Sequence, residues 1–133
     1  MTDNLPTPEE ILRVHEKIEE EQDVKYTGTM KAAPKAKLRR NVVELAAEHD
    51  DPYHRAAVLL FEIPSVHVFE DANKRTAWTV TKSYLKREGI DLDPPQDDDT
   101  IERIVRRTGL FDMEELAGWL ETGEIDEGKL PEH

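Results

Sequence analysis

Apolar residues recur at helical spacing along most of the chain, and short polar or proline-containing segments separate these stretches. In the first stretch, Ile11, Val14 and Ile18 fall on one face of a helix, because side chains three or four positions apart are neighbours on a helix surface. The alternation of apolar and polar residues that marks a half-buried strand never extends beyond a few positions. The pattern therefore predicts an all-α protein.

Capping residues divide this pattern into about six helices. Thr7, Asp97 and Asp112 are expected to be N-caps, because their side-chain oxygens can accept hydrogen bonds from the first free backbone N–H groups. Gly89 is expected to end its helix in the left-handed conformation. The helices are predicted at about residues 8–22, 34–46, 52–64, 73–89, 97–108 and 112–123.

A chain of 133 residues has room for one domain. We expect a single domain over residues 1–133, with an ordered core at about 7–123 and a polar tail at 124–133. The expected core residues are the apolar positions that fall on the inner helix faces. They are Ile11, Val14, Ile18, Leu38, Val42, Leu45, Val58, Leu59, Phe61, Phe69, Val80, Tyr84, Leu85, Ile104, Leu116 and Trp119.

The absence of cysteine excludes disulfides, thiolate nucleophiles and thiolate zinc sites, and it favours a cytoplasmic location. The longest apolar run, Ala56 to Phe61, is far shorter than the roughly 20 residues of a membrane span. Residues 1–6 have neither the basic nor the apolar region of a signal peptide. We therefore expect no membrane partner.

Charge is distributed unevenly within a formal net charge of −12. Residues 1–87 carry 15 acids and 14 bases, whereas residues 88–133 carry 15 acids and 4 bases. The acidic last third disfavours direct nucleic-acid binding, which needs cations against phosphates. It suits either a salt-loving source or an ordinary acidic surface. Residues 24–43 contain six bases and no acid, which is either a binding surface for an anionic partner or a solvated helix face.

The segment His67 to Ala77 carries the candidate chemistry, and its second half opens a predicted helix. A helix N-terminus presents unpaired N–H groups and the positive end of the helix dipole, so it favours anions. Lys74 and Arg75 add two positive charges there, and the amide of Asn73 can cap the helix or contact the anion. These three residues predict a phosphate site.

The first half of the segment supplies the other groups that phosphate chemistry needs. Asp71 precedes the helix and offers the hard carboxylate oxygens that Mg²⁺ prefers. His67 has the side chain with a pKa nearest neutrality, which makes it the candidate general base. Phe69 lies between polar positions and is expected to turn inward and fix the loop to the core. The whole resembles a magnesium–polyphosphate site with a base beside it.

This segment, HVFEDANKRTA in one-letter code, resembles the Fic/Doc family signature H-x-F-x-[D/E]-[A/G]-N-x-R. It is most similar to the Doc (death-on-curing) toxin branch, whose members carry H-x-F-x-D-A-N-K-R-T-A. The resemblance implies a Fic/Doc-type bundle of about six helices with the motif loop before the fourth. It further implies that His67 deprotonates a target hydroxyl, that Asp71 binds Mg²⁺, and that Phe69 is structural. Asn73, Lys74 and Arg75 would bind nucleotide phosphates.

The Doc branch implies a toxin of a toxin–antitoxin system. Such a toxin is a protein kinase-type transferase that uses ATP and Mg²⁺, phosphorylates a threonine of a Tu-type translation elongation factor and blocks protein synthesis. Adenylyl-transferring members carry a glycine after the asparagine and a second arginine three residues after the first, where this chain has Lys74 and Trp78. Adenylyl transfer is the alternative activity. No inhibitory Ser/Thr-x-x-x-Glu-Gly/Asn motif occurs, so a separate antitoxin is expected.

Two alternatives belong to other classes of protein. Residues 100–122 could form a helix-turn-helix DNA-binding regulator, but the second helix, Asp112 to Glu121, holds four acids and no base and would repel DNA. The chain could also be an inactive Fic-like binding module, although every polar position of the motif is filled.

Overall fold

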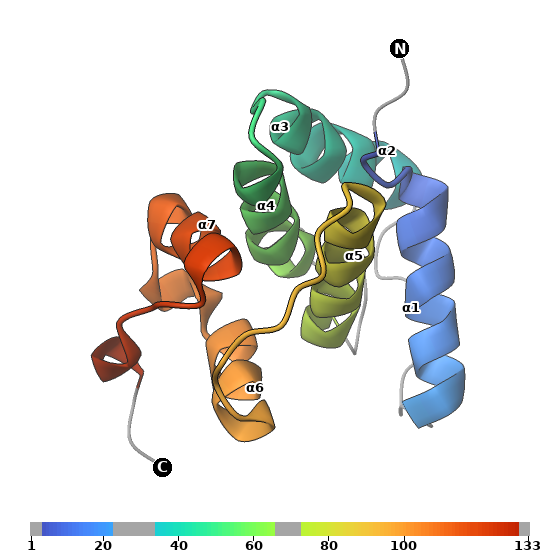
Figure 1. The fold of residues 1–133 in the computed structure, drawn as a ribbon. Helices are drawn as coiled ribbons and strands as arrows, with labels where there is room; N and C mark the ends of the chain where they lie inside the picture. Colours follow the sequence, from blue (N-terminus) through green and yellow to red (C-terminus); the bar gives the residue numbers. More distant parts are fainter. Residues whose placement is uncertain (1–3, 23–33, 66–72, 131–133) are drawn as a thin grey trace.

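The computed structural model describes residues 4–22, 34–65 and 73–130, and every regular element within these ranges is helical (Figure 1). The longer helices are α1 (Pro8–Gln22), α4 (Pro52–Ser65), α5 (Asn73–Arg87), α6 (Asp98–Arg106) and α7 (Met113–Thr122). Three short elements follow one another without a break: α2 (Pro34–Leu38), the π-helical η1 (Arg39–Val43) and α3 (Glu44–Ala47). Two 3₁₀ turns complete the set, η2 (Thr108–Leu110) and η3 (Glu127–Lys129). The predicted all-α fold is confirmed.

Reciprocal side-chain caps fix the helix starts that the sequence predicts. The Thr7 hydroxyl accepts a hydrogen bond from the Glu10 N–H at 3.1 Å, and the Glu10 carboxylate accepts one from the Thr7 N–H at 3.0 Å. Asp112 and Glu115 form the same capping box at the start of α7, with distances of 2.8 and 3.0 Å. Each box satisfies two backbone donors that the helix itself leaves unpaired.

Two predicted helix ends were wrong by one or two residues. Pro64 does not end α4 but lies inside its last turn, and the Ser65 hydroxyl donates to the Phe61 carbonyl at 2.9 Å. The predicted helix to Thr108 stops at Arg106, and the chain then tightens into η2. Proline removes one hydrogen bond without unwinding a helix that is about to end, so its position alone did not set the boundary.

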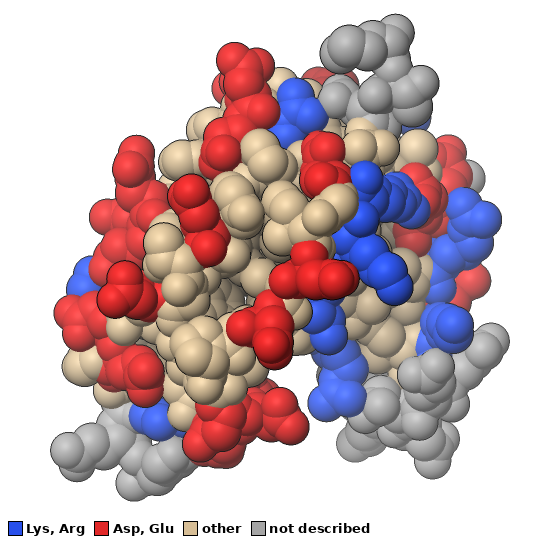
Figure 2. Space-filling model, in the orientation of Figure 1, with Lys and Arg blue, Asp and Glu red and all other residues tan. Residues whose placement is uncertain are grey.

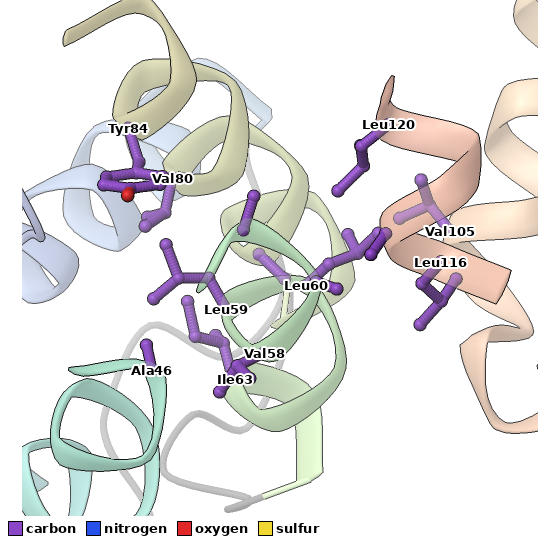
Figure 3. Close-up of a cluster of buried hydrophobic side chains, with 14 of the residues drawn as sticks. Ala46, Val58, Leu59, Leu60, Ile63, Val80, Tyr84, Val105, Leu116 and Leu120 are labelled. Atoms are coloured by element: carbon purple, nitrogen blue, oxygen red, sulfur yellow. The ribbon is translucent and has the colours of Figure 1, made fainter. Parts of the chain in front are cut away.

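The core is built around α4, which packs against both α5 and α7 (Figure 1). Its buried residues are Ala56, Ala57, Val58, Leu59, Leu60 and Ile63. Figure 3 shows side chains of α4 meeting Val80 and Tyr84 of α5 on one side and Leu116 and Leu120 of α7 on the other. A helix that is apolar on most of its circumference is accommodated only where neighbours cover several faces.

Most of the predicted core is buried, with three corrections. Val14, Leu45 and Phe61 are only partly buried and pack at the edge of the cluster. Each lies at the border between the apolar and polar sides of its helix, where the sequence pattern alone does not distinguish buried from partly exposed positions. Phe69 lies outside the described residues.

Some residues of the predicted polar tail contact the rest of the domain. Leu130 is 7% exposed and joins the core cluster, and the Lys129 ammonium lies 2.7 Å from the Glu115 carboxylate of α7. Among the described residues, none of the helices has the length and apolar character needed to cross a membrane.

Candidate active site at the start of α5

The sequence-predicted site residues divide between described and undescribed parts of the chain. His67, Phe69 and Asp71 lie outside the described residues, and their roles remain predictions. Asn73 is the first residue of α5, which confirms the predicted start of this helix, whereas the loop predicted before it lies outside the described residues. Lys74 and Arg75 occupy the first turn of that helix, and both side chains are exposed. The described half of the site is therefore a helix N-terminus with two cations.

This helix start has the properties of an anion site. The N–H groups of the first turn of an α-helix have no partner within the helix, and the helix dipole adds a partial positive charge. Positive side chains dominate the helix itself, since α5 contains Lys74, Arg75, Lys82, Lys86 and Arg87 and no acidic residue. Of these cations, Lys74 and Arg75 lie in the first turn, where they and the dipole favour a phosphate at the same end, whereas Lys86 and Arg87 lie in the last turn.

The Lys74 side chain reaches the end of a different helix. Its ammonium group donates a hydrogen bond to the backbone carbonyl of Arg106, the last residue of α6. A helix C-terminus carries the negative end of the dipole and unpaired carbonyls, so a lysine there is stabilised. The ammonium has three hydrogens, and one bond to a carbonyl leaves two for another acceptor.

The inner side of the first turn rests on α1. Thr76 and Ala77 are fully buried, and the Thr76 hydroxyl lies 3.1 Å from Nδ1 of His15 on α1. His15 is only 2% exposed. The sequence offered no reason to pair these two residues, which are 61 positions apart. This contact holds the buried side of the first turn of α5 against α1, opposite the exposed cations.

Trp78, in the second turn of α5, contacts helix α7 from the C-terminal part of the chain. The ring of Trp78 stacks on Trp119 of α7, with 5.5 Å between the centroids and 16° between the planes. The Lys82 ammonium lies 5.4 Å from the Trp78 centroid, within the range of a cation–π contact. Trp78 is therefore held by aromatic and cationic partners. Sequence reasoning identified Trp119 as a core residue but not as a neighbour of the motif helix.

A carboxyl group that the sequence analysis did not single out lies in the last part of α4. Partial burial raises the pKa of Glu62, because desolvation disfavours the ionised carboxylate. Its chain position, five residues before His67, places it close in sequence to the motif. Among the described residues, no group of three His, Asp or Glu side chains could hold a metal ion.

Charge is unevenly distributed on the face of the molecule that Figure 2 shows. In Figure 2, lysine and arginine side chains gather over α1 and α5, whereas aspartate and glutamate dominate the side formed by α6 and α7. The candidate site lies at the N-terminal end of the basic helix α5. The exposed Lys74 and Arg75 of the first turn attract an anionic ligand to this end.

Comparison with known protein families agrees with this site. The profile of the Fic/DOC family matches residues 5–85, which include the whole His67 to Arg75 motif and end within α5. Because the match covers more than half of the chain, the protein belongs to the Fic/DOC family. Members of this family are generally transferases that move a nucleotidyl or phosphoryl group and typically use a nucleoside triphosphate with Mg²⁺. A search of curated proteins gives no match.

Proposed function

We propose that this protein is a Doc-like toxin that transfers a phosphoryl group from a magnesium–nucleotide complex to a hydroxyl of a Tu-type translation elongation factor. The observation that carries the proposal is the exposed Lys74 beside the N-terminus of α5. In adenylyl-transferring relatives this position is a glycine, which leaves room for the backbone to approach the phosphates. Here a lysine brings a positive charge to the place where a phosphate would lie.

Trp78 supports the same choice between the two activities. The second arginine of the adenylyl-transferring pattern would stand at this position, but Trp78 is stacked on Trp119 and contacts Lys82. This side chain offers no charge to a second phosphate group. The cations of the first turn, Lys74 and Arg75, then act on one phosphate group, which favours transfer of the terminal phosphoryl group.

The described residues fit a nucleotide phosphate, because free helix N–H groups and two exposed cations are the donors that phosphate oxygens accept from. Lys74, Arg75 and the Asn73 amide would hold the phosphate oxygens, and Asp71 would hold the metal. When bound, the nucleotide would supply the phosphoryl group, and the magnesium ion would offset the negative charge of the phosphates. His67 would take the proton from the target hydroxyl as that oxygen bonds to the γ-phosphorus, while the bond from the γ-phosphorus to the β-phosphate oxygen breaks and the nucleoside diphosphate leaves. Positioning and charge stabilisation provide most of the acceleration in such transfers.

The DNA-binding alternative finds little support in the described helices. Leu116, Ala117, Trp119 and Leu120 turn one face of α7 into the core. The exposed positions of α7 include Glu114 and Glu121, which would repel the phosphates of DNA. The remaining alternative, an inactive Fic-like module that binds only a protein partner, predicts neither Mg²⁺–nucleotide binding nor transfer.

An antitoxin is the expected partner, because the family suggests a toxin–antitoxin context and the sequence has no inhibitory motif. Of the predicted basic patch in residues 24–43, the side chains of Lys37, Arg39 and Arg40 are described, and Arg39 and Arg40 are exposed. These residues favour an acidic antitoxin segment. Expression of the protein alone should arrest growth, and harmless expression of folded, nucleotide-binding protein would count against the toxin assignment.

The proposal is tested with ATP labelled separately at the α- and γ-phosphates, incubated with Mg²⁺, the protein and an elongation factor of the Tu type. Label transferred from the γ-position supports the kinase. Label from the α-position would assign the protein to the adenylyl-transferring branch. Transfer of neither label by a protein that also fails to bind Mg²⁺–ATP supports the inactive module. The His67→Ala variant controls for label transfer by a contaminating enzyme.

A further inference from the structure

The motif helix is joined to the C-terminal helices by two separate contacts. The Lys74 ammonium donates to the Arg106 carbonyl at the end of α6, and Trp78 stacks on Trp119 of α7. Both C-terminal partners lie beyond residues 5–85, the part that matches the family. The first two turns of α5 are thus supported by a part of the chain that lies outside the family match.

Trp119 is itself locked in one orientation. Its indole N–H donates to the side-chain oxygen of Gln96 at 3.0 Å, and the Gln96 amide donates to the Gly123 carbonyl at 2.7 Å. The Trp119 side chain is 1% exposed. Gln96 precedes α6 and Gly123 caps the end of α7. The two hydrogen bonds therefore link the start of α6 to the end of α7 through the indole of Trp119.

The stack is not required merely to attach α7 to the domain. Leu116 and Leu120 are buried in the main cluster against α4, which already fixes α7 to the core. The contact with the partly buried Trp78 instead fixes how the C-terminal helices approach α5. The end of α6, which carries the Arg106 carbonyl, packs against α5 and is joined to α7 through η2.

We propose that Trp119 and Gln96 are positioning residues for the phosphate site, acting through Lys74. They hold α6 and α7 so that the Arg106 carbonyl keeps the Lys74 ammonium in place, with two hydrogens left for a phosphate. A lysine that is already held loses fewer rotamers when the ligand binds. The inference rests on the proposed phosphate site but not on which phosphoryl or nucleotidyl group is transferred.

A spectroscopic test needs no ligand, because Trp78 and Trp119 are the two tryptophans of the chain. Two stacked indoles are expected to give a coupled near-ultraviolet circular dichroism signal. Lys74→Met should reduce this signal, because it releases the end of α6 from α5. Lys86→Met, an equivalent change in the last turn of the same helix, should leave the signal unchanged. An unchanged signal in Lys74→Met would overturn the coupling.

A double-mutant cycle tests the effect on the site, with the dissociation constant of Mg²⁺–ATP as the readout. Trp119→Leu should weaken binding by roughly three- to tenfold, in the lower part of the range of couplings within one network, and should have little effect in a Lys74→Met background. Gln96→Leu should act in the same direction, and Trp78→Leu replaces Trp119→Leu if that variant does not fold. Lys129→Met, which removes an ion pair on α7 remote from α5, is the control and should bind normally.

The outcomes separate this inference from the proposed function. Equal affinity of the wild type and Trp119→Leu overturns the positioning role alone. Equal weakening in both backgrounds also overturns it, since general destabilisation does not act through Lys74. If the wild-type protein does not bind Mg²⁺–ATP, the proposed function fails and the inference fails with it.

Discussion

Nδ1 of His15 on α1 lies 3.1 Å from the hydroxyl oxygen of Thr76 on α5, and both side chains are buried. The contact joins the N-terminal helix to the first turn of the helix that begins the candidate active site. Burial makes a polar contact of this kind costly to break, because the groups that remain have no water to bond. It therefore fixes the position of Thr76, and with it the exposed cations on the preceding residues.

Thr76→Val should lower the free energy of unfolding by about 1–3 kcal/mol, because it removes the hydroxyl that bonds the buried His15 ring. Thr81→Val is the matched control: Thr81 is also fully buried on α5, but its hydroxyl donates to the Ala77 carbonyl of the same helix at 2.7 Å. Chemical denaturation of both variants measures the difference. Equal losses of stability would indicate that the contact between the helices contributes nothing specific.

The two glycines with positive φ should respond differently to alanine. Gly89 and Gly123 have φ values of 82° and 81°, which L-residues other than glycine adopt at a cost of about 1–2 kcal/mol. A Cβ at Gly89 would meet no atom within 4 Å, whereas one at Gly123 would lie 2.6 Å from Cδ of Pro95. Gly123→Ala should therefore destabilise the protein more than Gly89→Ala, as measured by thermal unfolding. Similar melting temperatures would contradict the close approach of Pro95.

Glu10 should stabilise the fold in a pH-dependent manner. The hydrogen bond from the Arg87 guanidinium holds the pKa of the Glu10 carboxyl below its usual value of 4.5. A carboxyl whose pKa is lower in the folded state stabilises the fold at pH values above 4.5, and this contribution is lost as the pH falls through the folded-state pKa. Glu10→Gln should cost about 0.5 kcal/mol at pH 7 and less near pH 3, given the partial exposure of the pair.

Urea unfolding of the wild type and Glu10→Gln at the two pH values provides this comparison. The exposed Glu16 of the same helix is the control position, and Glu16→Gln should not reproduce the pH-dependent difference. A difference for Glu10→Gln that is as large at low pH as at pH 7 would mean that the ionised carboxylate is not the stabilising form.

Local signals in the sequence predicted the helices well. Thr7, Asp97 and Asp112 do cap α1, α6 and α7, because capping depends on residues within one turn. The glycine ends at positions 89 and 123 follow from the same local chemistry. Boundaries such as Pro64 and Thr108 were missed because packing, and not only the breaker residue, decides where a helix stops.

The candidate site was predictable only in part. The motif indicated Lys74 and Arg75 at a helix start, and α5 begins at the predicted residue. Contacts between distant segments, such as His15 with Thr76 or Lys74 with Arg106, could not be predicted, because a single sequence contains no signal that pairs them. The supports of the site were therefore found in the structure, whereas its candidate chemistry was found in the sequence.

Variants of the motif should separate binding from transfer. His67→Ala should reduce transfer by roughly 10²- to 10⁴-fold, because the proposed general base acts on the target hydroxyl. It should leave the dissociation constant of Mg²⁺–ATP nearly unchanged, since a base for the target does not hold the phosphates. Arg75→Ala should instead weaken nucleotide binding by about tenfold or more, the loss expected for a hydrogen bond to a charged group. Asp71→Ala should also weaken it through loss of the proposed metal ligand.

Calorimetric titration with Mg²⁺–ATP and a transfer assay on the same preparations measure the two effects separately. Lys86→Met is the control, because Lys86 is an exposed cation at the opposite end of α5 and should leave both binding and transfer unchanged. Loss of nucleotide binding in a folded His67→Ala protein would place the imidazole among the phosphate contacts and remove it as the base. Unchanged binding in Arg75→Ala would remove Arg75 from the phosphate contacts and leave Lys74 as the exposed cation of that turn.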